Sequence, residues 1–474
     1  MAISDTSRYL FEAILDQGTR NANFFNGRIL TADALQTEQD ANRRRGERLG
    51  QALGTGIITG LEVELVDPGA ADRYPVVSVS QGLALNPKGQ LLALPVDITK
   101  LQLTRQLTPT ALPAGLFAEC KPPKTDAAPP TDRGIYLLVA APTSCYEERA
   151  PKYDFSDTGK ASGCDSRYAT EGVQFRLAEL KLDDLAGLSQ DTRQALAALL
   201  AKDDTASLSK LRNWLAHVCF GTEELTDFQK DPLATVDHHS RYLSYGAVDA
   251  MRAANRLDPD KGVSECEAPL VLLFWTKTGV QFLDMWAVRR RAAPPPCSRD
   301  WPLLEDERSL AEAEARFFQF QTQIGQLLEK STFPASIKAH DYFRYLPSAG
   351  LLTLAGPGPK GVSATTFFQD LAVRYPRPPR FDSKDGPVFM EGARLKALLR
   401  DALSYPAIDA SGKEAVWLYR LRENRAAIAA EAGLRQTVIA FAHGQMPYYG
   451  SPRFDAAYFD YGNYSSVLLG PGGR

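Results

Sequence analysis

The sequence lacks the short motifs that identify most reaction types. In 474 residues it has only 5 His and 5 Met, no Gly-x-Ser-x-Gly and no Cys-x-x-Cys. These absences exclude a serine-hydrolase elbow, a zinc ribbon and a thioredoxin-like redox pair. Its longest apolar runs, 134–142 and 268–275, are far shorter than the ~20 residues of a membrane-spanning helix. We therefore expect no membrane span, and we interpret both runs as buried strands.

An excess of charge of one sign is also missing. Lys and Arg total 54, Asp and Glu total 57, and the formal net charge is −3. Such a balance indicates neither nucleic acid nor an anionic membrane as a partner. Residues 1–17 have neither the basic region nor the unbroken apolar region of a secretory signal. We expect a protein made in the cytoplasm.

Cysteines are few and widely spaced. Without an export signal, free or structural thiols are the favoured interpretation of all six. A disulfide between Cys145 and Cys164 stays open, because these two residues flank a stretch that resembles a loop. The six positions are Cys120, Cys145, Cys164, Cys219, Cys266 and Cys297.

Glycine and proline, by contrast, are abundant, with 35 and 31 residues. Together with the length, they predict several small domains joined by turns and irregular segments. We expect a multidomain α+β protein with small β-rich modules, an N-terminal linking helix, several further helices and long loops. The predicted parts are 1–120 (helix plus small β module), 131–293 (mixed α+β), 298–443 (α+β with a long helix) and 444–474 (an aromatic, Gly/Ser-rich arm).

Local signals define the first part most clearly. Thr31 is a candidate N-cap, Asp33 favours the first helical turn, and Gly54 is a helix stop, so a helix is predicted over 32–53. Its apolar stripe is narrow, as in a helix that lies between parts of a structure. Short strands are predicted after it at 57–66, 76–79 and 91–95, with a hairpin-like turn at 82–89.

Periodicity predicts further elements in the two central parts. We expect 146–167 to be a long polar surface loop, and 303–330 to be the longest helix. Shorter helices are expected at 191–202, 208–218 and 391–403, and strands at 173–182, 269–274, 280–283, 415–421 and 437–441.

No cofactor or metal site stands out. The glycines at 54–60 follow a helix and precede a strand, the reverse of the dinucleotide-binding order, and the prolines within 356–361 remove amides that would bind phosphate. His238 and His239 are adjacent and would point in different directions. A metal-dependent enzyme built on His217, His238 and His239 is therefore the less favoured alternative to structural roles.

Two clusters are candidate interfaces. The arginines of the first helix form either a solvated or ion-paired face, which we favour, or a protein contact. Tyrosines near the C-terminus favour docking to another protein over stacking on carbohydrate. With the two phenylalanines that precede the helix, the candidates are Phe24, Phe25, Arg43, Arg44, Arg45, Arg48, Tyr448, Tyr449, Tyr458, Tyr461 and Tyr464.

Several segments resemble uncharacterised proteins encoded with contractile injection systems and phage-tail-like particles. These segments are 24–32, 38–39, 56–63, 82–89, 269–273, 284–291 and 343–350. The resemblance implies a non-enzymatic structural component of the baseplate or fibre region. It implies as partners other particle subunits (baseplate, spike or fibre proteins), and a homo-oligomer stays open. A cell-surface or glycan-binding module is the alternative suggested by the tyrosines.

Overall fold

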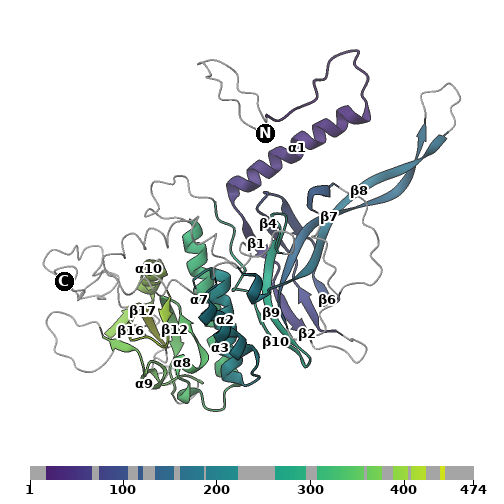
Figure 1. Ribbon diagram of the computed structural model, residues 1–474. Coiled ribbons are helices and arrows are strands. Elements are labelled where there is room, and N and C mark those ends of the chain that lie inside the picture. The colour runs from purple at the N-terminus through teal and green to yellow at the C-terminus, as the bar shows by residue number, and fades with distance from the viewer. Residues whose placement is uncertain are drawn as a thin grey trace, which may run out of the picture.

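A computed structural model gives the structure of the protein (Figure 1). It describes residues 18–66, 74–104, 116–120, 134–153, 161–185, 188–222, 262–294, 307–356, 360–375, 388–403, 407–422 and 438–443. These residues form helices and several small sheets, so the expected α+β class is confirmed. Of the helices in these ranges, none is both long and apolar enough to cross a membrane.

Helix α1 (Ala32–Leu53) has the predicted bounds. The Thr31 hydroxyl accepts a hydrogen bond from the Ala34 amide at 3.3 Å, which satisfies one of the free amides of the first turn. Gly54 follows the helix with φ of 89°, a conformation that favours glycine and ends the helix. The local signals therefore located both ends of α1.

Two three-stranded antiparallel sheets form a β module after α1. One sheet has the order β1-β4-β5 and the other β2-β3-β6. The strands are β1 (Gly56–Gly60), β2 (Val63–Val66), β3 (Val76–Val79), β4 (Gly82–Leu85), β5 (Leu91–Leu94) and β6 (Ile98–Gln102).

A four-stranded sheet of order β10-β9-β7-β8 follows the module. Alternate residues of β7 face opposite ways: Leu137 packs against α2 and α3, whereas Leu138 packs against the β module. Both faces of the sheet are therefore covered, which explains the continuous apolar run of β9. The elements are β7 (Gly134–Tyr153), β8 (Ala161–Glu179), β9 (Ala268–Thr276), β10 (Gly279–Asp284), α2 (Gln190–Leu200) and α3 (Thr205–Phe220).

The prediction that residues 146–167 form a surface loop is wrong. The described residues of this stretch belong to β7 and β8, which pair from Tyr136↔Glu179 to Tyr153↔Ala161. The outer half of this hairpin extends beyond the sheet as a two-stranded ribbon (Figure 1). Its side chains are mostly solvent-exposed on both faces, so it lacks the apolar alternation by which a half-buried strand is recognised.

A third unit is built on the long helix α7 (Glu307–Lys330) and a sheet of order β12-β17-β16-β13, in which β14 also pairs with β16. Its core holds a cluster of aromatic rings that includes Phe320, Phe343 and Phe441. The remaining elements are α8 (Ala339–Tyr342), β11 (Tyr345–Leu346), β12 (Ala349–Thr353), α9 (Ala364–Phe367), β13 (Ala372–Arg374), β14 (Val388–Glu391), α10 (Gly392–Leu403), β15 (Ile408–Asp409), β16 (Ala415–Arg422) and β17 (Val438–His443), with short 3-10 turns at Ala118–Cys120, Leu182–Asp184 and Pro334–Ser336.

Arginines after β10 connect the units. Arg289 donates to the carbonyls of Leu61 and Gly60 in the β module, at 2.9 and 2.6 Å. Arg290 pairs with Glu312 of α7 at 2.6 Å. The basic cluster 289–291 is therefore an internal connection between the β module and α7. The division into four parts stays a prediction.

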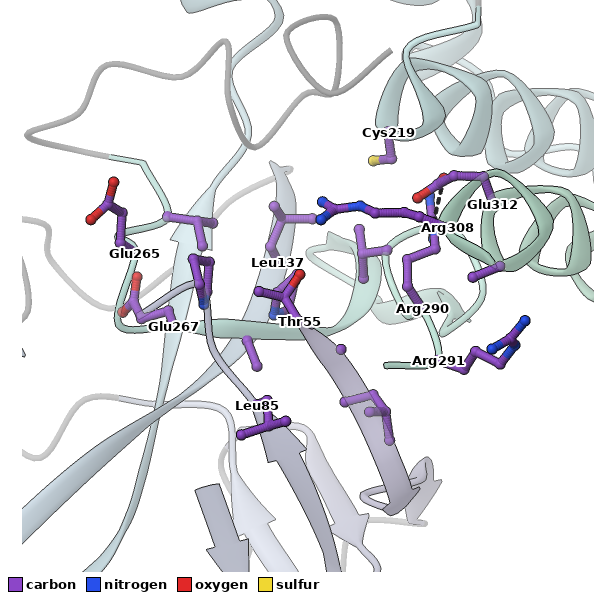
Figure 2. A pocket seen from close by; sticks show the side chains of 18 of the residues that line it. Thr55, Leu85, Leu137, Cys219, Glu265, Glu267, Arg290, Arg291, Arg308 and Glu312 are labelled. Carbon is purple, nitrogen blue, oxygen red and sulfur yellow. Dashed lines mark hydrogen bonds and ion pairs between the residues drawn. The ribbon is translucent and has the colours of Figure 1, made fainter. Parts of the chain in front are cut away.

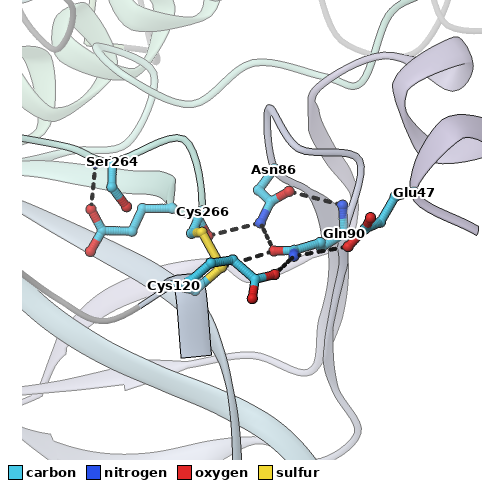
Figure 3. The surroundings of a disulfide bond; sticks show 8 residues. Glu47, Asn86, Gln90, Cys120, Ser264 and Cys266 are labelled. Atoms are coloured by element: carbon cyan, nitrogen blue, oxygen red, sulfur yellow. Dashed lines mark hydrogen bonds between the residues drawn. A yellow bond between two sulfur atoms is a disulfide. The ribbon is translucent and has the colours of Figure 1, made fainter. Parts of the chain in front are cut away.

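The expectation of six free or structural thiols is wrong, because Cys120 and Cys266 form a disulfide (Figure 3). The open alternative is wrong as well, because Cys145 and Cys164 are free. In the ribbon Cys145 pairs with Thr170 and Cys164 with Pro151, six positions further along, or about 20 Å at strand spacing. The bonded pair is 146 residues apart in sequence, so only the tertiary structure reveals it. Cys219 is buried and forms no disulfide, and Cys297 lies outside the described residues.

The disulfide can be tested by peptide mapping. We expect a proteolytic digest made without reductant to contain a peptide pair linked through Cys120 and Cys266, and reduction to separate the two. A Cys145→Ser/Cys164→Ser variant should keep this linked pair, because neither ribbon thiol takes part in it. A linked pair that contains Cys145 or Cys164 in the native protein would contradict the assignment.

Candidate protein-interaction site

Apolar side chains are exposed along α1 and the segment before it. Figure 1 shows α1 extending away from the sheets, whereas α2, α3 and α7 lie beside them. Large apolar side chains of this region are 49% to 77% exposed, which is the usual property of a surface covered by a partner. They are Phe24, Phe25, Ile29, Leu30, Leu35, Leu49 and Leu53, and we call them the α1 apolar surface.

The C-terminal end of α1 is fixed to the β module through small and polar groups. Gly50 lies against Gly89 so closely that a Cβ on Gly50 would be 2.0 Å from the Gly89 carbonyl oxygen. Gln90 donates to Glu47 at 3.1 Å, and Gln51 donates to the Lys88 carbonyl at 3.2 Å. These contacts use one side of the helix and leave its leucines exposed.

The four arginines of α1 do not share one environment. Arg43 is half-buried, lies 3.6 Å from Asp40 and has its guanidinium 5.9 Å from the centre of the Phe117 ring. Arg45 is exposed and donates to the side chains of Asn42 and Asn21 at 2.8 and 2.5 Å. Arg44 and Arg48 are also exposed. Their contact role stays a prediction.

The β7–β8 ribbon is a second exposed surface, which the sequence analysis missed. Tyr146 and Tyr168 are 40% and 50% exposed, and the Arg167 guanidinium lies 5.0 Å from the centre of the Tyr168 ring. Arg167 also pairs across the strands with Glu148 at 3.4 Å. Three tyrosines in a polar stretch were the only signal in the sequence, because the pairing of the strands depends on the sheet from which they extend.

The other predicted site residues are not brought to α1. Tyr448, Tyr449, Tyr458, Tyr461 and Tyr464 lie outside the described residues, as do His238 and His239. His217 is buried in α3, where its Nδ1 lies 2.8 Å from the Thr222 hydroxyl and its ring packs 4.6 Å from that of Tyr345. In the described part of the chain no three His, Cys, Asp or Glu side chains gather as metal ligands would.

Burial, with a smaller contribution from Arg316 and Arg344, holds the pKa of His217 well below its usual range. In the unfolded chain the imidazole binds a proton near pH 6.5, whereas the folded chain keeps it neutral. Stability should therefore fall as the pH drops below 6.5, by about 1 kcal/mol between pH 7 and 5.5. Urea unfolding at both pH values should show this loss to be smaller in His217→Gln; an unchanged pH dependence in that variant would contradict the assignment.

A cavity of about 400 Å³ lies between the β module, β9, α3 and α7 (Figure 2). Two of its three carboxylates pair with arginines, Glu312 with Arg290 and Glu267 with Arg176. Arg308 extends from α7, and Cys219 from α3 contributes a thiol. The described lining contains no histidine that could activate this thiol, so the cavity does not define a reaction.

Comparisons with known proteins add little. No family model matches the chain, and no curated protein matches it. Among solved structures, a crystal structure of TssK aligns at 12% identity and a TM-score of 0.19, over 52% of this chain and 66% of that one. The aligned part is thus just under two thirds of the TssK chain, and at this TM-score the similarity carries no argument about fold or function.

Proposed function

We propose that this protein is a non-enzymatic structural component of a contractile injection system or phage-tail-like particle, in the baseplate or fibre-attachment region. The observation that carries the proposal is the α1 apolar surface. Burying one Leu or Phe side chain stabilises a complex by about 1.5–3 kcal/mol. Seven such side chains in one region therefore favour a permanent protein partner over a free surface.

Two further observations support the same function. Segment 24–32, which contributes several of these side chains, is also one of the segments that resemble proteins encoded with such particles. The β7–β8 ribbon offers another projecting surface for a neighbouring subunit. Because the net charge is only −3, long-range electrostatic attraction contributes little to binding by this chain. Shape complementarity and apolar contact are then the expected sources of its binding to other subunits.

The test is to purify the native particle and identify its subunits by mass spectrometry. A photo-crosslinking amino acid at Leu49 should join this chain to particle protein, whereas the same amino acid at Lys413, an exposed residue of the β15–β16 turn, should not. Absence of the chain from purified particles would refute the proposal. Specific binding to a glycan array by a chain absent from particles would favour the cell-surface alternative instead.

A further inference from the structure

One exposed face of α1 is lined by uncharged residues at alternating intervals of four and three, the spacing of a coiled-coil seam. Leucine occupies three of its six positions, all towards the two ends of the helix. All six seam positions are exposed and uncharged, although the helix carries eight charged residues elsewhere. The seam consists of Leu35, Gln39, Asn42, Gly46, Leu49 and Leu53.

Among the described residues, the protein's own contacts leave most of this seam open, although Arg45 donates to the Asn42 side chain at 2.8 Å. Gly50 and Glu47, through which α1 packs on the β module, lie outside the seam. At Gly46 an added Cβ would meet nothing within 4 Å, so another backbone can approach closely there. The seam extends over 18 residue steps, or about 27 Å of helix, which is long enough to pair with a second helix.

Charges beside the seam select the partner and its direction. Glu38 directly precedes the seam residue Gln39. Arg43, five residues after Glu38, directly follows the seam residue Asn42. In a parallel pair of identical helices, Glu38 of each copy lies beside Arg43 of the other copy. An antiparallel pair would instead place Arg43 beside Arg43 and Arg45 beside Arg45, which is repulsive.

The polar middle of the seam also fits a second copy in register. Parallel pairing places Gln39 opposite Gln39 and Asn42 opposite Asn42, so each amide can donate to and accept from its counterpart. Leucines at both ends of the seam supply the apolar contact.

We infer that α1 pairs in parallel with α1 of a second copy of this chain. The inference builds on the proposed function, because it names the partner of the α1 apolar surface. Each half of the pair contributes Leu35, Leu49 and Leu53, and two Glu38–Arg43 pairs form across the seam. The result is a two-fold symmetric dimer in which the β modules of both copies lie at the same end of the helix pair.

Charge reversal on the full-length chain tests this inference by sedimentation equilibrium. We expect the wild type to dimerise, and Glu38→Arg or Arg43→Glu alone to raise the dissociation constant about tenfold, since like-charge pairs then replace opposite ones. The double variant Glu38→Arg/Arg43→Glu should restore dimerisation. Arg44→Glu, on the opposite side of the helix, is the matched control and should change nothing.

Three outcomes would overturn the inference: a monomeric wild type, single variants that dimerise normally, or a double variant that stays dissociated. Circular dichroism of each variant shows whether it is folded, so a folding defect cannot imitate dissociation. A monomer that is nevertheless crosslinked through Leu49 to another particle subunit refutes only the pairing. A dimer that is absent from particles refutes only the proposed function.

Discussion

Replacing Arg212 with Met is expected to lower the free energy of unfolding by about 3–5 kcal/mol. Asp284 is fully buried at the end of β10 and accepts a hydrogen bond from Arg212 at 2.7 Å. It also accepts one from Gln319 of α7, so this carboxylate lies where three elements meet. Without Arg212 the carboxylate remains buried without a cation, and that is the source of the loss. Urea unfolding followed by tryptophan fluorescence measures it.

The matched control is Arg167→Met in the ribbon. Arg167 pairs with Glu148, but both side chains are more than half exposed, so water replaces the lost partner. We expect a change below about 0.5 kcal/mol. Equal losses in the two variants would show that burial of the Arg212–Asp284 pair is not the determining factor.

Replacing Gly50 with Ala is expected to detach α1 from the β module, at a cost of about 3 kcal/mol. The new Cβ would lie 2.0 Å from the Gly89 carbonyl oxygen, a backbone atom that cannot move away alone. Separation of the two elements would also break the hydrogen bond between Glu47 and Gln90. Limited proteolysis should cut within residues 50–56 faster in this variant, and thermal unfolding should begin earlier.

Gly46→Ala is the control for this prediction. It places the same methyl group in the same helix, where nothing of the same chain lies within 4 Å. Because Gly46 is also a seam position, both variants are compared at a protein concentration below that of dimerisation. Helix propensity alone should then stabilise α1 by about 1 kcal/mol. If Gly50→Ala were tolerated as well as Gly46→Ala, the close packing of Gly50 on Gly89 would be wrong.

Local chemistry made several elements predictable from sequence. Thr31 caps α1 and Gly54 ends it through interactions within a few residues, so no distant contact was needed to locate the helix. The hairpin of β9 and β10 was equally clear, because its apolar run is buried on both faces and its turn contains Gly279. Where a signal and its cause lie in the same segment, sequence is sufficient.

The candidate site was predictable only in part. Phe24, Phe25 and the arginines of α1 were identified as contact candidates, but the exposed leucines were not. A narrow apolar stripe does not show which side of the helix the rest of the protein covers. That side depends on Gly50 packing against Gly89, 39 residues away. The ribbon was missed because its strands are stabilised by pairing with each other and by the sheet from which they extend.

The sequence by itself determined the α+β class, the helix and strand boundaries set by caps and turns, and the absence of any familiar catalytic motif. Only the tertiary structure decided that Cys120 bonds Cys266, that Arg289 and Arg290 connect the β module to α7, and that the leucines of α1 remain exposed. The physical reason is distance along the chain. Caps and turns act between near neighbours, whereas disulfides, buried ion pairs and exposed faces arise from segments that meet only after folding.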